Sequence, residues 1–313
     1  MTTALFFVAG LALLYVGGEA LVRSASAIGM RFGMTPMVIG LTIVAFATSA
    51  PEAAVSIGAA LNNEPGLAVG NVVGSNLCNI SLLVGIVIVV SQPRLREKLD
   101  RGDVAVMALS TILVPAMLLD GLLTRIEGTS LLLAITAYIA VTVWRVHTRR
   151  SGESPDVPST VPVLTQSLIN NLLVCAVGVA FLIVGSELLV TSSIEIAVTL
   201  GIPPAVVGLS AAALGTSLPE LAASIIAARH NQPEMAAGNL IGSNIFNLLL
   251  VLGATSMVHP LTLGAVTFFD IAFMVGVSLL SLTLMVSRVR LYLFEGVALI
   301  ATYFAYLIIL FRS

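Results

Sequence analysis

Charged residues are scarce in this chain. Asp, Glu, Lys and Arg make up only 10% of its 313 residues, whereas hydrophobic residues make up 58% and the mean hydropathy is +1.07. A soluble domain carries about 25% charged residues, so this chain could not cover its apolar surface in water. In a bilayer the same composition is expected, because lipid replaces water around the apolar faces. The sequence therefore predicts an integral membrane protein.

Cysteine, histidine and extended polar segments are scarce too. The two cysteines, Cys78 and Cys175, both fall in apolar runs, so we expect buried thiols and no disulfide framework. No stretch is long and polar enough for a soluble domain, and the net charge of −2 gives no indication of a nucleic-acid partner or of an obligate protein partner. An intramembrane hydrolase would need a nucleophile with a base, or paired Asp residues, and no such group is apparent in the apolar runs. The sequence therefore predicts neither an enzyme nor a bound cofactor.

Long apolar runs make up most of the chain. A helix needs about 20 apolar residues to cross the hydrocarbon core. The first run lacks a basic leader and a clear cleavage site, so we interpret it as a membrane helix and not as a removable signal. Ten runs qualify as all-α transmembrane spans: 4–22, 36–60, 67–90, 103–120, 128–146, 167–190, 204–228, 235–258, 268–286 and 291–311. The polar segment 147–166 separates residues 1–146 from residues 167–313, with five helices on each side.

Basic residues indicate the topology. If the N-terminus lies outside, only Arg125 and Arg312 of the 14 Lys and Arg residues fall on the outer side. Such an excess of inner basic residues is the usual positive-inside bias. We therefore expect a multi-pass protein of the plasma (cell inner) membrane whose linker at 147–166 is cytoplasmic.

One short passage occurs twice. Residues 48–52 read Thr-Ser-Ala-Pro-Glu and residues 216–220 read Thr-Ser-Leu-Pro-Glu, and each is followed by a Gly-Asn-x-x-Gly-Ser-Asn-x-x-Asn string, at 70–79 and 238–247. The offset is constant, since 220 − 52 = 168 and 247 − 79 = 168. Further matches extend over all five helices: Glu19 with Glu187, Pro36 with Pro204, Asn63 with Asn231, Asp103 with Asp270 (shifted by one residue) and Tyr138 with Tyr306. Because five is odd, the second copy enters the membrane from the opposite side. This predicts two inverted five-helix repeats, as in many secondary transporters.

Each Thr-Ser-x-Pro-Glu passage lies inside an apolar run. Pro51 has no N–H and clashes with the carbonyl four residues back, so the backbone from Ala45 to Thr48 should kink and expose carbonyl oxygens. Thr48, Ser49 and Glu52 lie near one helix face by their spacing. Hydroxyls, freed carbonyls and a carboxylate form an all-oxygen set of the kind that Ca²⁺ and Na⁺ prefer. The second passage repeats this set with Ala213, Thr216, Ser217 and Glu220.

The Gly-Asn strings supply a facing polar stripe. Asn71, Ser75 and Asn79 have i, i+4, i+8 spacing and so share one face of a helix. The second string repeats the stripe with Asn239, Ser243 and Asn247. Glycines at 66, 70 and 74 form a separate small-residue face that permits close helix approach.

The two carboxylates have no fixed cationic partner, because no Lys or Arg lies in the central parts of the four helices. A charge at the bilayer centre costs about 2.5–3.5 kcal/mol on insertion scales. Glu52 and Glu220 must therefore be protonated or neutralised by a mobile cation. One Ca²⁺ would balance the pair and Na⁺ could replace it, which gives a physical basis for exchange.

At these residues the chain resembles a known family. The strings GTSLPE and GNLIGSNIFN, with their partners ATSAPE and GNVVGSNLCN, are similar to the two alpha repeats of sodium/calcium exchangers, in the cation/calcium antiporter superfamily. The resemblance covers nearly the whole chain. It implies a ten-helix inverted-repeat fold and alternating access, with several Na⁺ ions traded for one Ca²⁺ in electrogenic Ca²⁺ extrusion.

The resemblance also implies a role for individual residues. Glu52 and Glu220 would be the shared Ca²⁺ ligands, completed by the carbonyls of Thr48 and Thr216. The Na⁺ sites would be lined by Ser49, Ser75, Ser217, Ser243 and the carbonyls of Ala45 and Ala213, with Asn79 and Asn247 at the centre.

Two departures bear on the coupling ion. Potassium-dependent members carry Asp at the position of Asn247, so Asn here argues against potassium co-transport. The proton/calcium branch places Glu in its Gly-Asn-x-x-Glu string, whereas this chain has Gly74 and Gly242, which favours Na⁺. A proton/calcium antiporter that uses the same two Glu residues is the main alternative, and a passive cation channel is a second.

Other polar residues are expected to have structural roles. Glu19 can pair with Arg23 at i+4 near the inner surface. His147, His230 and His259 lie near predicted helix ends, so we expect no zinc site there.

Overall fold

Helices make up nearly all of the described chain. The computed structural model describes residues 2–93, 99–149, 167–199, 214–287 and 290–310. Within these ranges nine helical segments are long and apolar enough to cross a membrane. They correspond to nine of the ten predicted runs, while the run at 204–228 is described only from residue 214 and most of the predicted linker lies outside the described ranges. The prediction of an all-α membrane protein is confirmed.

The first half of the chain contains the elements α1 to α8. They are α1 (Thr2–Arg31), α2 (Pro36–Ile39), the π-helix η1 (Gly40–Val44), α3 (Ala45–Thr48), α4 (Ala50–Leu61), α5 (Pro65–Leu77), the π-helix η2 (Cys78–Leu83), α6 (Val84–Ser91), α7 (Arg101–Met117), the 3-10 helix η3 (Leu118–Asp120), strand β1 (Leu122–Leu123) and α8 (Arg125–Arg149).

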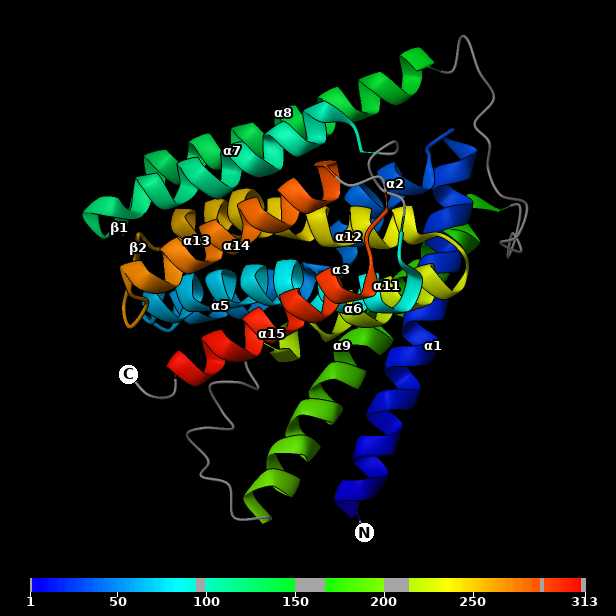
Figure 1. The fold of residues 1–313 in the computed structure, drawn as a ribbon, viewed down its shortest axis with the longest axis horizontal. Helices are drawn as coiled ribbons and strands as arrows, with labels where there is room; N and C mark the ends of the chain where they lie inside the picture. The colour runs from blue at the N-terminus through cyan, green and yellow to red at the C-terminus, as the bar shows by residue number, and fades with distance from the viewer. Residues whose placement is uncertain (1, 94–98, 150–166, 200–213, 288–289, 311–313) are drawn as a thin grey trace.

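The second half has the matching order. Its elements are α9 (Leu168–Thr199), α11 (Leu218–Arg229), α12 (Pro233–Phe246), the π-helix η4 (Asn247–Val251), α13 (Leu252–Val258), strand β2 (Leu261–Thr262), α14 (Phe268–Ser287) and α15 (Leu293–Leu310). Strands β1 and β2 pair antiparallel, which joins the two halves at one end of the bundle (Figure 1).

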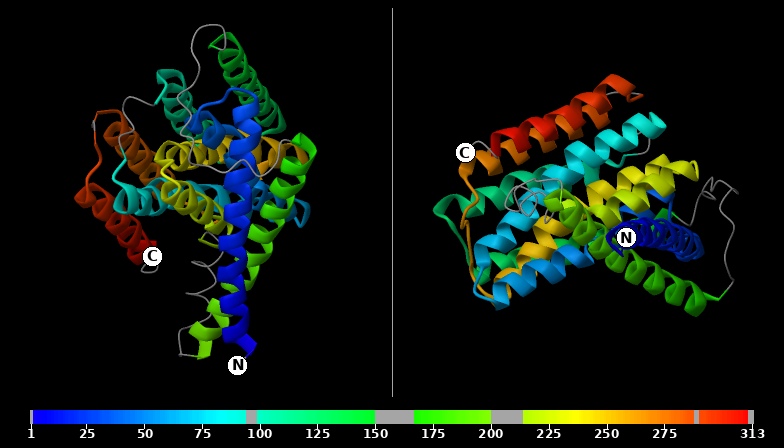
Figure 2. Two further views of the ribbon diagram at one scale, coloured as in Figure 1. Left: turned by 90° about the vertical axis from the view of Figure 1, so that its right-hand side faces the viewer. Right: turned by 90° about the horizontal axis from the view of Figure 1, so that it is seen from below.

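Helices α1 and α9 form a long pair that crosses the other helices steeply (Figures 1 and 2). Glycines allow their backbones to approach closely: a Cβ on Gly10 would lie 2.9 Å from the carbonyl oxygen of Gly185, and one on Gly17 would lie 2.8 Å from that of Gly178. Because 10 + 168 = 178 and 17 + 168 = 185, the repeat offset exchanges these two contacts. This is the pattern expected of two helices related by a two-fold axis.

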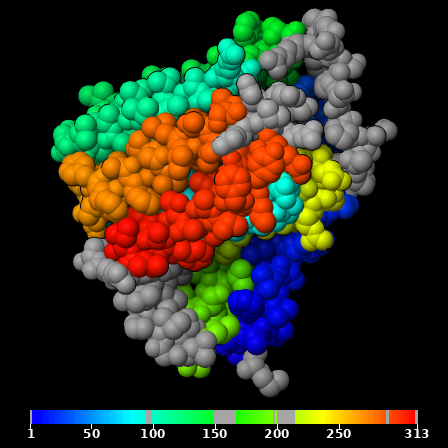
Figure 3. All heavy atoms as spheres, viewed as in Figure 1, coloured from blue at the N-terminus to red at the C-terminus, as the bar shows by residue number. Residues whose placement is uncertain are grey.

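The inner part of the bundle is formed by α5 and α12. Residues of α12 from Met235 to Phe246 are all buried. Helices α14 and α15 cover much of one face of the bundle (Figure 3). The centre of the bundle is therefore shielded by protein.

Local backbone geometry repeats with the same offset. Asn63 follows α4 with φ 61°, and Asn231 follows α11 with φ 57°. Asn is favoured in this left-handed conformation after a helix. The π-helices η2 and η4 also begin within one residue of matching positions, at Cys78 and Asn247.

The predicted ion pair on α1 is present. Arg23 and Glu19 form an i, i+4 salt bridge. Both carboxylate oxygens of Glu19 also lie 3.0 Å from Nε2 of His230, the residue that follows α11. This contact ties α1 to the end of α11, and the sequence offers no local signal for it.

Candidate ion-exchange site

Two helices are interrupted at matching positions. Helix α3 ends at Thr48 and α4 begins at Ala50, with Ser49 between them at φ −79° and ψ 2°. Ser217 has nearly the same conformation before α11, at φ −86° and ψ 0°. Pro51 and Pro219 lie in the first turns of α4 and α11, where a missing N–H costs nothing. The helix is therefore broken near Pro51 as predicted, but the break lies at Ser49 and the predicted stretch from Ala45 to Thr48 is α-helical.

Glu52 and Glu220 occupy the first turns of these new helices. Both side chains are fully buried, at 0% exposure. Helix N-termini carry a partial positive charge that favours a carboxylate there. None of the four carboxylate oxygens has a hydrogen-bond partner of standard geometry, and neither group forms an ion pair within the described residues. The pair is thus positioned by the fold and left without a fixed counter-charge.

Residues of the opposite repeat lie beside each carboxylate. Thr216 is next to Glu52, while Thr48 and Ser243 are next to Glu220. Each carboxylate therefore has a threonine hydroxyl from the other half of the chain beside it, and Glu220 also has Ser243 from its own half.

Two asparagines brace the acidic helices from the facing stripes. Asn71 Nδ2 donates to the Glu52 carbonyl at 3.4 Å and to Ser56 Oγ at 3.0 Å. Its counterpart makes the same pair of bonds, from Asn239 to the Glu220 carbonyl at 3.3 Å and to Ser224 Oγ at 3.0 Å.

Hydrogen bonds also cross between the repeats. Thr48 Oγ1 donates to Asn239 Oδ1 at 3.2 Å and lies 3.3 Å from Ser243 Oγ. The counterpart contacts join Thr216 Oγ1 to Asn71 Oδ1 at 3.4 Å and to Ser75 Oγ at 3.1 Å. The two stripes and the two broken helices thus form one polar centre, as the inverted repeat predicted.

Several polar atoms at this centre have no partner. Asn79 and Asn247 are fully buried, and neither the amide nitrogen nor the amide oxygen of either side chain is hydrogen-bonded by a described residue. The hydroxyls of Ser49 and Ser217 are also buried without a hydrogen bond to a described residue. Buried polar groups are normally paired, so a cluster of unpaired ones indicates a place that another species occupies.

Two backbone carbonyls, of Ala45 and Ala213, were also predicted as Na⁺ ligands. The Ala45 carbonyl accepts hydrogen bonds from Ser49 N at 3.0 Å and from Thr48 Oγ1 at 3.4 Å. A cation at that oxygen would compete with both donors. Ala213 lies outside the described residues.

A second pair of asparagines was missed by the sequence analysis. Asn76 Nδ2 donates to the Asn244 carbonyl at 3.4 Å, which joins the two repeated strings near the two-fold axis. Both residues belong to the Gly-Ser-Asn part of the strings, so the repetition itself was the available signal.

The donor set suits a hard cation that binds and leaves. It consists of two carboxylates with hydroxyl, amide and carbonyl oxygens, the ligand types that Ca²⁺ accepts. In the part of the chain that the structure describes, no cluster of three or more His, Cys, Asp or Glu residues is found. The two carboxylates together have the charge to balance one divalent ion.

Comparisons with known proteins agree with this geometry. The profile of the family described as "Sodium/calcium exchanger protein" matches residues 2–146 and 170–312. The putative antiporter CaxA of Alkalimonas amylolytica is 34% identical over 326 residues, covering 100% of both chains. The sodium/calcium exchanger MaX1 of Methanosarcina acetivorans is 31% identical and covers 98% of each chain.

A solved structure gives the same answer for the fold. The sodium-calcium exchanger NCX_Mj, soaked with 10 mM Na⁺ and zero Ca²⁺, is 31% identical, with a TM-score of 0.80 over 97% of both chains. The present chain therefore belongs to the sodium/calcium exchanger family, and it is a multi-pass cation/calcium antiporter and not an enzyme.

Proposed function

We propose that this antiporter exchanges Na⁺ for Ca²⁺ at the paired carboxylates of Glu52 and Glu220. The observation that carries the proposal is that both groups are fully buried and lack a cationic partner among the described residues. Leaving two such charges in a dry interior costs several kcal/mol each. One Ca²⁺ neutralises both, and Na⁺ ions that enter from the other side can displace it.

The proposal gives each group the ligand role that the family resemblance implies. Glu52 and Glu220 bind Ca²⁺ with the carbonyls of Thr48 and Thr216, which lie where the helices break. The neutral oxygens line the Na⁺ positions: Ser49, Ser75, Ser217, Ser243 and the carbonyls of Ala45 and Ala213. Asn79 and Asn247 separate these positions at the centre.

The close packing around Gly242 supports Na⁺ over H⁺ as the coupling ion. A Cβ at this residue would lie 2.6 Å from the Leu41 carbonyl oxygen and 2.7 Å from the Ala45 Cβ. Proton/calcium exchangers typically have Glu at this position, and a Glu side chain has no room here. The only acidic groups of the proposed site are then Glu52 and Glu220.

Gradient-driven flux tests the coupling ion. In proteoliposomes, an outward Na⁺ gradient should drive uptake of ⁴⁵Ca²⁺, whereas a pH gradient without Na⁺ should not. Uptake driven by pH alone would replace the proposal with proton/calcium exchange. Uptake that needs no counter-ion on the opposite side would indicate a passive channel.

Charge movement is a further part of the proposal. With more than two Na⁺ per Ca²⁺, a net positive charge leaves a Na⁺-loaded vesicle in each uptake cycle. An interior-positive potential should therefore speed Ca²⁺ uptake, with about 2.3 kcal/mol available per charge per 100 mV. In the cell we propose Ca²⁺ extrusion across the plasma (inner) membrane, with the N-terminus outside.

Asn247→Asp should change ion preference more than it changes expression. The added carboxylate would place a third negative charge near Glu52 and Glu220, and a full negative charge attracts a cation more strongly than the neutral amide that it replaces. We expect the Na⁺ dependence of ⁴⁵Ca²⁺ flux to shift and K⁺ to affect it, while the variant purifies in normal yield. Unchanged dependence on both ions would show that residue 247 lies away from the transported cations.

A further inference from the structure

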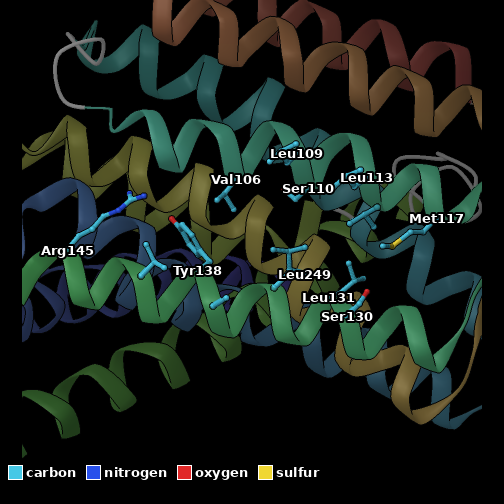
Figure 4. A pocket seen from close by; sticks show the side chains of 14 residues that line it. Val106, Leu109, Ser110, Leu113, Met117, Ser130, Leu131, Tyr138, Arg145 and Leu249 are labelled. Atoms are coloured by element: carbon cyan, nitrogen blue, oxygen red, sulfur yellow. The ribbon is translucent and has the colours of Figure 1, made fainter.

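A groove of about 400 Å³ lies between α7 and α8, away from the ion site (Figure 4). It extends along α7 from Val106 to Met117, and Leu249 of η4 forms its floor. Eleven residue steps of helix span about 16 Å, which is about the depth of one leaflet of a bilayer whose hydrocarbon core is about 30 Å thick. Its walls are mostly apolar, so the groove fits an extended hydrocarbon chain.

The two repeats differ at Val106, one of the residues that line the groove. In the second repeat, Phe273 stacks on Tyr306, with ring centroids 5.1 Å apart. The residue that matches Phe273 in the first repeat is Val106, by the same one-residue shift that relates Asp270 to Asp103. Valine leaves empty the space that a phenyl ring takes up in the other half.

The matching tyrosines also differ in their hydrogen bonds. Tyr306 donates its hydroxyl proton to Asp270 Oδ1 at 2.9 Å. Tyr138 lines the groove and is 6% exposed, and the Asp103 carboxylate lies beside its hydroxyl without a hydrogen bond of standard geometry. The Tyr138 hydroxyl is therefore held less closely than that of Tyr306.

A guanidinium closes the same end of the groove. Arg145 lies one turn before the end of α8, and Figure 4 places it beside Tyr138. Its Nη1 pairs with Asp100 at 3.0 Å and with Asp103 at 3.7 Å. Both ion pairs use the same nitrogen, so the rest of the planar fork can donate to a phosphate.

We propose that this groove binds a membrane phospholipid, with one acyl chain along α7 and α8 and the phosphate at Arg145. The apolar length and the Arg145 guanidinium at one end, whose Nη2 takes part in neither ion pair, together match one amphiphile of this kind. The floor residue Leu249 is two positions after Asn247, so the bound chain packs against the π-helix that contributes to the ion site.

Filling the groove tests the proposal. Val106→Phe gives the first repeat the residue that occupies this space in the second, and Ala134→Phe fills the groove from an exposed position on α8. Purified protein in detergent is titrated with dioleoyl-phosphatidylglycerol, and retained lipid is counted by native mass spectrometry. We expect both variants to lower the apparent affinity for one lipid by about tenfold or more. Leu133→Phe, on the lipid-facing side of α8 and outside the groove, should bind as the wild type does.

A separate variant tests the contact between the phosphate and Arg145. Arg145→Gln should weaken phospholipid binding and leave binding of dioleoylglycerol, which has no phosphate, unchanged. Equal lipid retention by the wild type and Ala134→Phe, in protein that is monodisperse, would overturn the proposal. So would a wild-type dimer that Val106→Phe dissociates, because the groove would then belong to a second copy of the chain.

Discussion

Glu52→Gln or Glu220→Gln should reduce Na⁺-driven ⁴⁵Ca²⁺ uptake about a hundredfold or more. Gln keeps the size of the side chain and removes the charge, so the remaining carboxylate faces a divalent ion alone. Removing one partner of a buried ionic contact costs about 3–5 kcal/mol, and every 1.4 kcal/mol is a factor of ten in affinity. Because both residues are fully buried and occupy matching positions, the two variants should lose Ca²⁺ uptake to a similar extent.

Thermal unfolding separates loss of binding from loss of folding. Without Ca²⁺, each variant removes an unpaired buried charge, so its Tm should be no lower than that of the wild type. Ca²⁺ should raise the Tm of the wild type and leave the Tm of the variants unchanged, since only a bound ligand stabilises the native state. Glu187→Gln is the matched control, because Glu187 also lies in an apolar run and is exposed on α9. Full exchange by either site variant would contradict the assignment of the paired carboxylates.

The 168-residue offset predicted most of the architecture. Once two strings with a constant offset are recognised, the glycine contacts between α1 and α9 and the crossed hydrogen bonds of Thr48 and Thr216 follow as symmetry mates. Proline geometry also predicted an interrupted helix before each Glu, although the breaks lie at Ser49 and Ser217 and not in the stretch from Ala45 to Thr48. These features depend on local covalent geometry and on repetition, and both can be read from one sequence.

Helix ends were predicted less well because hydropathy measures contact with lipid and not with protein. The first span was expected at 4–22, yet α1 continues to Arg31. Ser24 and Ser26 lower the hydropathy of that segment, although both are buried in the bundle, at 0% and 1% exposure. A polar residue that faces another helix has the same sequence signature as one that faces water.

Contacts without a local signal could not be predicted. The π-helices η1, η2 and η4 have no composition that sets them apart from α-helix. The contact of His230 with Glu19 joins residues 211 positions apart. The groove is lined by Val106, where the second repeat has Phe273, and similarity between the repeats gives no signal for such a difference. The ligand roles of the site residues remain predictions that flux measurements have to test.

Gly242→Ala should destabilise the protein, and Gly242→Glu should prevent it from folding. The new Cβ would lie 2.6 Å from the Leu41 carbonyl oxygen and 2.9 Å from the Leu41 Cα. These are backbone atoms of η1 and cannot rotate away, so α12 has to move off its neighbour. Overpacking of this kind costs about 1–3 kcal/mol for small additions. Glu adds more volume and an unpaired carboxylate, which is costly inside the membrane.

A glycine with free space around it supplies the control. Nothing lies within 4 Å of a Cβ placed on Gly276 of α14. Gly276→Ala should therefore raise stability, by up to about 1 kcal/mol from helix propensity. Thermal unfolding in detergent compares the three variants, and a Gly242→Ala protein as stable as the wild type would show that α12 is not held against η1 as closely as the structure places it.

The same substitution bears on the choice of coupling ion. Ser243 Oγ lies 3.3 Å from Thr48 Oγ1, so moving α12 away from η1 would pull apart two of the proposed ligands. Exchange by Gly242→Ala should accordingly fall together with its stability. A folded Gly242→Glu protein that takes up Ca²⁺ under a pH gradient would mean that space at this residue does not exclude the proton-coupled design, and the preference for Na⁺ would then have to come from the oxygens of the site itself.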